Sequence, residues 1–430
     1  MRRIVIFGGI FLAAGAVQAQ TALTFRQALQ RAVQVNNTVE RARADVTAAE
    51  ANKELLLSNV MPRIVASGSA IRNGQAVTFG SGSDATTVLA QNDWNYRLVL
   101  SQPVFAGRRE LRAYSQAKLG IASAEQAELG TEDAVLLRVA SNYLALVNAD
   151  ARINIEKGNI ALAEKRRTQA NAFFEAGEVT KVDVLRAETA IKASQRALAV
   201  AQQNRDEAES RLRADLDLTG SIVATTPEQP MPPVPPEQDL IAKAETVRPD
   251  VVLAANNVKI AELEIQKQRG FWWPTVTFDG GLTAQKAAFP SAHNTYGALR
   301  FTVPVLQSGE VEARVAGAKA RELQSRLDLE NAKINAREDV RQALAALNAA
   351  ETSLGLAKEQ LSAAEAEYAQ EFELYRAQEA TSLDLASSEQ ALADARRAVA
   401  EETLNRDEAA LRVWYASGAM REALNLGANQ

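Results

Sequence analysis

The sequence predicts a mainly α-helical protein built from two copies of one helix–strand–strand–helix unit. Three observations predict this fold class. Long stretches are dominated by Ala, Glu, Gln, Arg and Leu, and only 5% of the residues are aromatic, a composition that favours long helices. The chain repeats its own pattern at a fixed spacing. Two short segments in each half alternate apolar with polar residues and lack helical periodicity.

Composition excludes several kinds of site. The 430 residues include no Cys, which excludes disulfides, thiolate metal sites, a cysteine nucleophile and a lipid anchor on an N-terminal Cys. The single His, His293, stands beside Pro290 in a loop, where a surface role is the default. The formal net charge of −5 gives no reason to expect nucleic acid as a partner. No nucleophile–base pair or phosphate-cradling loop stands out, so we expect no enzyme, cofactor or metal site.

The N-terminus has the pattern of an export signal. Arg2 and Arg3 precede an apolar run from Ile4 to Val17, and small residues stand two positions apart at Val17 and Ala19. We therefore expect a signal peptide over residues 1–19 that is removed after Ala19. An uncleaved anchor is the alternative, but the apolar run is short for a membrane span. No later segment has the length and apolar character of a transmembrane helix.

Three pairs of matching segments indicate an internal duplication. They are 61–65 with 273–277, 102–105 with 303–306, and 178–184 with 379–385. The second and third pairs share an offset of 201 residues, so the long segments between them have equal lengths. The sequence therefore predicts a first repeat over 20–224 and a second over 240–430. The segment 225–239 between them contains six prolines and predicts a semi-rigid linker.

Each repeat is expected to begin with a broken helix. Thr24 and Gln27 have the spacing of a capping box, which starts a helix. The break is expected near Asn36-Asn37 in the first repeat and at Pro249 in the second. Pro62 ends the first of these helical segments, because proline lacks an amide donor and disfavours helix at the residue before it.

Strands and a long helical hairpin follow in each repeat. The strands are expected at about 62–80 and 93–103 in the first copy and at about 274–285 and 294–304 in the second. Alternation is clearest where Trp94, Tyr96, Leu98 and Leu100 alternate with Asn95, Arg97, Val99 and Ser101. The hairpins are expected over 107–216 and 308–417. The stretch from Gly107 to Ala176 has no proline and predicts roughly 100 Å of helix, with Gly177 as the residue that closes it.

Strands of this kind are what a membrane β-barrel requires. They alternate over about ten residues, and Trp94, Tyr96, Trp272 and Trp273 near their ends are candidates for the membrane–water interface. Two ordinary hairpins on a soluble core are the alternative, but the helices offer no compact globule to cover them. One chain supplies four strands, whereas such barrels begin at about eight, and an open sheet edge in lipid leaves backbone groups unsatisfied. The barrel must be shared by two or three chains, and an aqueous duct favours three.

Taken together, these features resemble the TolC family of outer-membrane efflux and secretion ducts. The resemblance covers essentially the whole mature chain. It is carried by Leu23–Leu29, the strand entries at Pro62 and Pro274, the Pro-Val-Phe-Ala-Gly run at 103–107, and the Gly-x-x-x-x-x-Asp tip at 177–183. It implies a homotrimer with a shared 12-stranded β-barrel in the outer membrane and a long α-helical barrel as a periplasmic tunnel. The implied function is the passive exit duct of a tripartite efflux pump or a type I secretion system.

The resemblance also implies partners and sites. The partners are a periplasmic adaptor (membrane fusion) protein, an inner-membrane RND or ABC transporter, and outer-membrane lipid. A periplasmic gate carries over to Asp183, Tyr375 and Asp384, with Ser387 in place of a second Asp and Ala380 in place of an Arg. A Tyr375–Asp183 hydrogen bond is therefore possible, whereas the family's Arg-based salt bridge is not. The implied adaptor-contact tips are Gly177, Glu178, Val179, Thr180, Gln378, Glu379, Ala380 and Thr381, where Gln378 replaces the family's turn Gly.

Two alternatives stay open from the sequence. Asp183 and Asp384 each stand three residues after a Thr with capping-box spacing, so both are explained by helix capping as well as by gating. The two roles are compatible, and three copies of Asp384 around an axis would form an acidic ring that favours cations. The alternative function is a periplasmic coiled-coil adaptor without a pore. The cargo is not indicated.

Overall fold

The computed structural model describes residues 21–82, 85–227, 232–286, 293–424 and 426. The predicted signal peptide over 1–19 therefore lies outside the described residues. The chain divides into two compact units. One comprises Met1–Asn37, Asp133–Glu237 and Val340–Gln430, and the other comprises Thr38–Glu132 and Gln238–Asp339. Each unit contains parts of both sequence repeats, so the compact units are not the repeats themselves. We call them the hairpin unit and the sheet unit respectively.

Most of the described chain is helical. The helices are α1 (Phe25–Val35), α2 (Asn37–Ser58), α3 (Arg109–Glu175), α4 (Lys181–Leu216), α5 (Glu237–Val247), α6 (Pro249–Arg269), α7 (Glu310–Arg376), α8 (Ser382–Ala416) and α9 (Met420–Ala423), with a 3₁₀ turn, η2, at Gly270–Trp272. Both α3 and α7 have 67 residues, and their starts are 201 positions apart, which confirms the duplication. Within the described residues, no helix combines the length and apolarity needed to cross a membrane.

Local signals explain where the shorter helices begin and end. Thr24 and Gln27 form the predicted capping box, with Thr24 N–H donating to Gln27 Oε1 at 3.0 Å. Asn36 is extended, which separates α1 from α2, and Pro249 opens α6, where its missing N–H costs nothing. The proline-rich linker is shorter than predicted. Helix α5 already starts at Glu237, because the residues that follow Pro236 are free to form a first turn.

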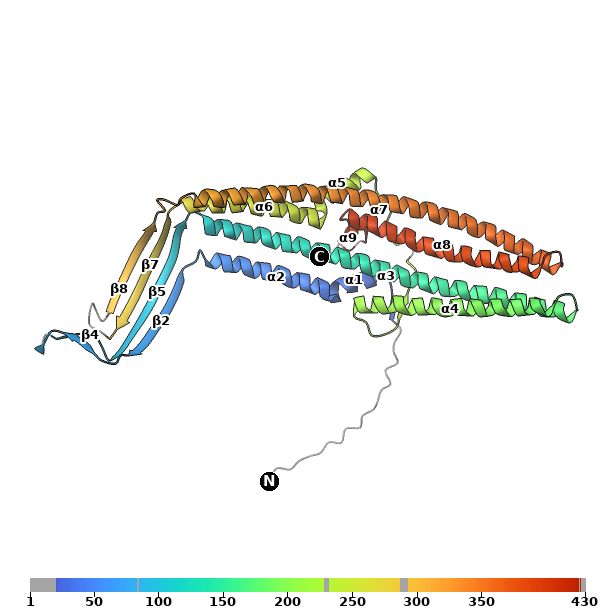
Figure 1. The fold of residues 1–430 in the computed structure, drawn as a ribbon, viewed down its shortest axis with the longest axis horizontal. Helices are drawn as coiled ribbons and strands as arrows, with labels where there is room; N and C mark the ends of the chain where they lie inside the picture. Colours follow the sequence, from blue (N-terminus) through green and yellow to red (C-terminus); the bar gives the residue numbers. More distant parts are fainter. Residues whose placement is uncertain (1–20, 83–84, 228–231, 287–292, 425, 427–430) are drawn as a thin grey trace, which may run out of the picture. The chain divides into compact units, whose positions relative to one another are not determined.

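The sheet unit contains a four-stranded antiparallel sheet (Figure 1). Its strands are β2 (Arg63–Arg72), β5 (Asn92–Ala106), β7 (Thr275–Gln285) and β8 (His293–Thr302), in the order β2-β5-β7-β8. The central β5–β7 pair joins the two repeats, with Leu98 opposite Leu282. Strands β2 and β8 form the two edges, and each has one paired side in the described chain.

Three predicted strand boundaries were wrong. The strand expected over 62–80 stops at Arg72, and β3 (Val77–Phe79) pairs with β4 (Thr86–Leu89) in a separate two-stranded sheet. The Asn73-Gly74 turn sequence causes the interruption, since Asn73 Nδ2 donates to the carbonyl of Ala90 at 2.7 Å. Strand β5 continues past residue 103 to Ala106 through a bulge at Pro103, which has no N–H for the ladder. The strand expected over 294–304 ends at Thr302.

The hairpin unit has a core that includes a strand pair the sequence did not predict. Strand β1 (Thr21–Leu23) runs parallel to β6 (Ile222–Ala224). The hydroxyl of the fully buried Tyr143 lies 2.7 Å from the carbonyl oxygens of both Leu23 and Thr225, and it accepts the N–H of Thr225 at 2.9 Å. Tyr143 thus fastens the start of the described chain and the end of the first repeat to α3.

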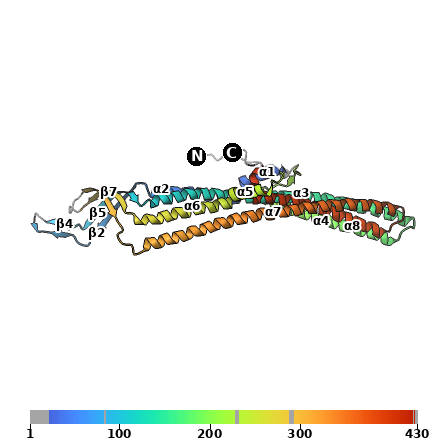
Figure 2. The same cartoon turned by 90° about the horizontal axis from the view of Figure 1, so that it is seen from above.

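Two antiparallel helical hairpins complete the hairpin unit. Helix α3 turns back into α4 and α7 turns back into α8, and both turns lie at the same end of the unit (Figures 1 and 2). Leu392 and Ala395 of α8 pack with Ala364 of α7 and Leu162 of α3, so the two hairpins share an apolar core. This packing places the two turns beside each other.

Candidate functional site

The candidate gate lies at the two hairpin turns, which have the same backbone structure. In the first turn, Gly177 N–H donates to the carbonyl of Phe174 and Glu178 N–H to that of Phe173. In the second, Gln378 N–H donates to Tyr375 and Glu379 N–H to Leu374. This pair of bonds is the Schellman motif that ends a helix on a left-handed residue. The duplication therefore extends to individual hydrogen bonds.

The left-handed position differs between the copies. Gly177 has a φ of +77°, as predicted for the residue that closes α3, and Gln378 has a φ of +61°. A side chain costs about 1 kcal/mol or more in this conformation. The amide Nε2 of Gln378 donates to the carboxylate of Glu178 on the other tip. The replacement of glycine thus creates a contact between the two hairpins.

Asp183 and Asp384 cap the helices that follow the turns. The carboxylate of Asp384 accepts the N–H of Thr381 at 3.0 Å and its hydroxyl at 2.6 Å. These bonds, the hydroxyl's first, lower the pKa of Asp384. Asp183 does the same with Thr180, and it also accepts the hydroxyl of Ser382 from the second hairpin. The Ser382 bond is the largest effect that lowers the pKa of Asp183, although burial opposes it.

The hydrogen bond considered possible between Tyr375 and Asp183 is absent. Among the described residues, the buried hydroxyl of Tyr375 has no hydrogen-bond partner. The tyrosine ring instead packs edge-on against Phe173, with centroids 5.6 Å apart, and beside Leu385. The Asp183 carboxylate is occupied by Thr180 and Ser382. Burial, together with the nearby Asp183 charge, raises the pKa of Tyr375, so it stays neutral.

Two buried ion pairs connect the hairpins further from the tips. Arg166 of α3 is 5% exposed and its Nη1 lies 2.5 Å from Glu389 Oε2 of α8. Glu156 of α3 is 4% exposed and receives two hydrogen bonds from Arg397 of α8, at 2.7 and 3.1 Å. Sequence reasoning missed both pairs, because each joins residues more than 200 positions apart on helices whose charges otherwise face solvent. We call the Arg166–Glu389 and Glu156–Arg397 pairs the α3–α8 seam.

The remaining predicted tip residues are exposed. Ser387 lies on the exposed side of α8, three residues after Asp384. The eight predicted adaptor-contact residues all lie in the turns, with Val179 and Ala380 half-buried and the others exposed. Beside them, Val182 and Leu383 occupy equivalent positions in the two copies and are 52% and 62% exposed. The tips therefore present apolar side chains as well as polar ones to solvent.

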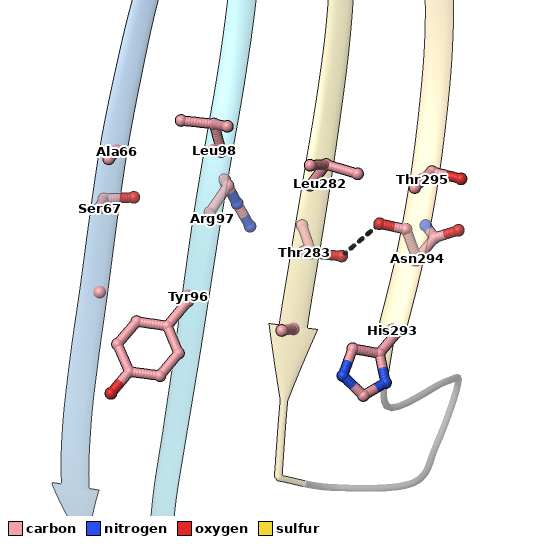
Figure 3. A pocket seen from close by; sticks show the side chains of 12 residues that line it. Ala66, Ser67, Tyr96, Arg97, Leu98, Leu282, Thr283, His293, Asn294 and Thr295 are labelled. Carbon is pink, nitrogen blue, oxygen red and sulfur yellow. Dashed lines mark hydrogen bonds between the residues drawn. The ribbon is translucent and has the colours of Figure 1, made fainter.

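The four-stranded sheet has one mainly apolar face, and the opposite face carries most of its polar side chains, although Val65, Ile71 and Val99 also lie there. The Tyr96 ring, which Figure 3 shows, packs against Gly68 of the neighbouring strand, where an added Cβ would be 2.8 Å from Tyr96 Cδ1. By strand alternation and register, this face also carries the following residues: Ile64, Ala66, Trp94, Leu98, Leu100, Phe278, Leu282, Leu299 and Phe301. On the opposite face, Asp279 accepts a hydrogen bond from Ser101 at 2.8 Å and pairs with Arg300 at 3.2 Å.

The four aromatic residues proposed for the membrane interface lie near opposite ends of the strands. Trp94 and Tyr96 contact each other, with ring centroids 5.3 Å apart, near the end of the sheet that carries the loops. Trp272 and Trp273 precede β7 at the end where the helices join, and Trp273 packs against Phe105. Tyr96, Trp272 and Trp273 are all more than half exposed.

A family model described as outer membrane efflux protein matches residues 28–216 and 240–419. The chain belongs to this family. The two matched segments correspond to the two repeats and omit the proline-rich linker. As an outer membrane efflux protein, the chain is a transport protein and not an enzyme. Family membership favours the predicted duct over the alternative of a periplasmic adaptor.

Solved structures share the fold of this efflux protein. The chain superposes on CusC with a TM-score of 0.80 at 17% identity, covering 92% of each chain. It superposes on the outer membrane channel CmeC of Campylobacter jejuni with a TM-score of 0.76 at 18% identity, covering 92% of this chain and 86% of that one. The open MtrE outer membrane channel of Neisseria gonorrhoeae gives 0.78 at 19%, covering 92% and 89%. These likenesses confirm the predicted fold class.

Proposed function

We propose that three copies of this chain close into a ring that conducts substrates passively through the outer membrane, as the exit duct of a tripartite efflux pump or a type I secretion system. The single observation that supports this most is the two-faced sheet. Its apolar face suits lipid and its polar face suits a water-filled interior, which is the alternation that membrane barrels use. The part of the chain that the structure describes has four such strands, so a closed wall needs further copies.

The strand order suits closure between copies. Adjacent strands are antiparallel throughout the order β2-β5-β7-β8, so β2 and β8 run in opposite directions. The β8 edge of one copy can therefore pair antiparallel with the β2 edge of the next, and the ring then has no unpaired edge. Three copies give twelve strands, which leaves room for an aqueous duct.

The spacing of the aromatic residues fits a membrane. Lys286 lies opposite Trp94, since its N–H donates to the Trp94 carbonyl. Trp273 lies 13 residues before Lys286 in the sequence. Thirteen strand residues span ~44 Å, or ~33 Å along the axis at a typical barrel tilt. The hydrocarbon core of a bilayer is about 30 Å thick. Both aromatic groups would then lie near the membrane–water interfaces.

The duplication predicts the register of the joint between copies. Within the chain, Leu98 of β5 lies opposite Leu282 of β7. Strand β8 corresponds to β5 with an offset of 201, and β2 corresponds to β7 with an offset of 212. An equivalent joint between copies places Leu299 opposite Ala70 of the neighbouring copy. Both residues belong to the apolar face, as closure requires.

Cysteine cross-linking tests this arrangement, since the native chain has no Cys. The doubly substituted Ala70→Cys/Leu299→Cys protein, oxidised in native membranes, should give cross-linked trimers on a denaturing gel. The matched control is Ala70→Cys with Ala298→Cys, whose side chain points to the opposite face, and it should cross-link far less. Single-channel conductance in planar bilayers tests the pore itself. A monomeric product without conductance would refute the duct.

We propose that the hairpin tips form the periplasmic gate, with Asp183, Tyr375, Asp384 and Ser387 at its constriction. The exposed carboxylate of Asp384 supports this, since three copies around the axis would form an acidic ring. Asp384→Ala should weaken block of the channel by divalent and trivalent cations. Asp45→Ala is the matched control, because it removes one carboxylate from α2, away from the tips. Unchanged block in Asp384→Ala would remove this residue from the pore lining.

We propose that the tips also bind a periplasmic adaptor, which links the duct to an inner-membrane RND or ABC transporter. The exposed apolar residues Val182 and Leu383 beside the turns support this, because apolar groups at a tip favour a protein contact. Val182→Ser with Leu383→Ser should lower efflux in cells while conductance of the purified channel is unchanged. Leu356→Ser, an equally exposed apolar residue outside the tips, is the control.

A further inference from the structure

The apolar face of the sheet contains a hollow of about 840 Å³ near the loop end of the strands. It is lined by the small residues Ala66, Gly68 and Ala284 and by larger ones that include Tyr96, Leu98 and Leu282. Figure 3 labels Ala66, Tyr96, Leu98 and Leu282 among them. Ala66 and Gly68 lie on β2 and Ala284 lies on β7, so small residues flank Tyr96 and Leu98 of the intervening strand β5 and leave space beside them. Most of the lining surface is apolar, which suits hydrocarbon, although Arg97, His293 and Thr295 also border the hollow.

A second hollow of about 450 Å³ adjoins the first and shares Tyr96 with it. It is lined by Arg72 at the end of β2 and Lys286 directly after β7, together with Trp94 and Asn92. Both cations are exposed, and within the described chain neither makes an ion pair. By strand alternation, both stand on the apolar face, at the end of the sheet away from the helices.

One acidic residue also lines the second hollow. Asp93 follows Asn92, so strand alternation places its side chain on the opposite face from Arg72. Its carboxylate accepts the N–H of Trp94 at 2.8 Å. The positive charge of Arg72 and Lys286 is therefore not neutralised on the face where the hollow opens.

We propose that the two hollows form one lipid-binding site, in which an acyl chain occupies the apolar hollow and Arg72 and Lys286 bind the phosphate of an outer-leaflet lipid. The proposal rests on the proposed function, which turns this face toward lipid. Arg suits a phosphate because it donates two parallel hydrogen bonds, and Lys adds a point charge. The rings of Trp94 and Tyr96 suit the same headgroup level.

The position in the sheet identifies the leaflet. The opposite ends of all four strands lead into helices α2, α3, α6 and α7, whereas the hollows lie at the loop end. If the helices extend into the periplasm, the loop end reaches the outer leaflet. A phosphorylated glycolipid of that leaflet carries both of the groups that the site would bind.

Native mass spectrometry of the full-length protein in detergent tests the site with lipid A as the probe. The double variant Arg72→Gln/Lys286→Gln should weaken retention of lipid A at least about tenfold, and dephosphorylated lipid A should bind the native protein equally weakly. Arg72→Lys/Lys286→Arg, which keeps both charges, should retain binding within about threefold. Arg63→Gln is the control, because it removes a cation of β2 that strand alternation places on the opposite face and that lines neither hollow.

Three outcomes would overturn the proposal: unchanged binding in the double variant, an equal loss in Arg63→Gln, or equal retention of phosphatidylglycerol, which would remove the outer-leaflet assignment. Planar-bilayer conductance of the same preparations separates this proposal from the proposed function. Native protein that conducts but does not distinguish lipid A from its dephosphorylated form refutes the lipid site alone. Protein that does not conduct refutes the duct.

Discussion

The Arg166–Glu389 pair of the α3–α8 seam provides the sharpest test of how the two hairpins are held together. The side chains of Arg166 and Glu389 are 5% and 12% exposed. Glu389 Oε1 has no hydrogen-bond partner among the described residues, and Arg166 Nη2 reaches the carbonyl of Arg186 only at 3.5 Å. The pair is therefore incompletely satisfied: burial raises the pKa of Glu389, and the Arg166 charge opposes this shift only in part.

This geometry gives different magnitudes for removing one partner and for removing both. Glu389→Gln leaves the Arg166 charge buried without a counter-charge, which should cost about 3–5 kcal/mol. Replacing both residues by Met fills the same space with apolar atoms and should be nearly neutral or stabilising. Glu373→Gln is the control. Its pair with Arg376 is more than half exposed, so its loss should cost about 1 kcal/mol or less.

Hydrogen exchange of the purified protein measures the local effect. At tenfold per 1.4 kcal/mol, Glu389→Gln should speed exchange in the first turns of α8 by about 100- to 4,000-fold. Arg166→Met/Glu389→Met should restore protection to within about tenfold of the native protein. The reasoning is refuted if hydrogen exchange in α8 is no faster in Glu389→Gln than in Glu373→Gln. It is also refuted if α8 exchanges as fast in Arg166→Met/Glu389→Met as in Glu389→Gln.

Three further predictions concern single residues. Gln378→Gly should relieve the left-handed conformation and raise the free energy of unfolding by about 0.5–1 kcal/mol, measured by chemical denaturation, whereas Gly177→Ala should lower it. Tyr143→Phe should cost about 1–3 kcal/mol and speed hydrogen exchange at β1 and β6, because it unpairs buried backbone groups, while Tyr114→Phe should not. Although burial opposes the shift, hydrogen bonds from Lys267 and two glutamines lower the pKa of Glu264 from 4.5 to about 2. The ionised Glu264 therefore contributes fully to the free energy of unfolding above pH 4.5, and this contribution is lost as the pH falls toward 2. The difference in the free energy of unfolding between the native protein and Glu264→Gln should shrink across that window.

The sequence predicted the features that depend on local signals. The absence of proline and the abundance of Ala predict α3. The duplication then predicts a second helix of the same length, which is α7. The capping box at Thr24 and the glycine at Gly177 are read from a few adjacent residues, and the structure has both. Strand alternation also assigns the faces of β5 without knowledge of its neighbours.

Features that depend on contacts between distant residues were not predictable. Strands β1 and β6 have three residues each, and they pair because Tyr143 binds both of their ends. A hydrogen bond from Tyr375 to Asp183 was possible from the sequence, but the Tyr375 ring contacts Phe173, which depends on how the two hairpins pack. The break in the first strand is different, since Asn73-Gly74 is a turn signal that was present in the sequence.

The α3–α8 seam shows how the two copies have diverged. At the offset of 201, Glu389 and Arg397 of α8 correspond to Glu188 and Arg196 of α4, so that side of the seam is present in both copies. Arg166 and Glu156 of α3 correspond instead to Glu367 and Ala357 of α7. In the proposed ring, the joint that is equivalent to α3–α8 is formed by α7 of one copy and α4 of the next. That joint would place Glu367 opposite Glu188 and leave Arg196 facing Ala357, so neither ion pair could form. Glu367 and Glu188 would repel each other at a position where the α3–α8 seam has an attractive ion pair. The joint between copies would therefore be weaker than the seam within one chain. The proposed gate would then open between chains, while the two hairpins of each chain move together.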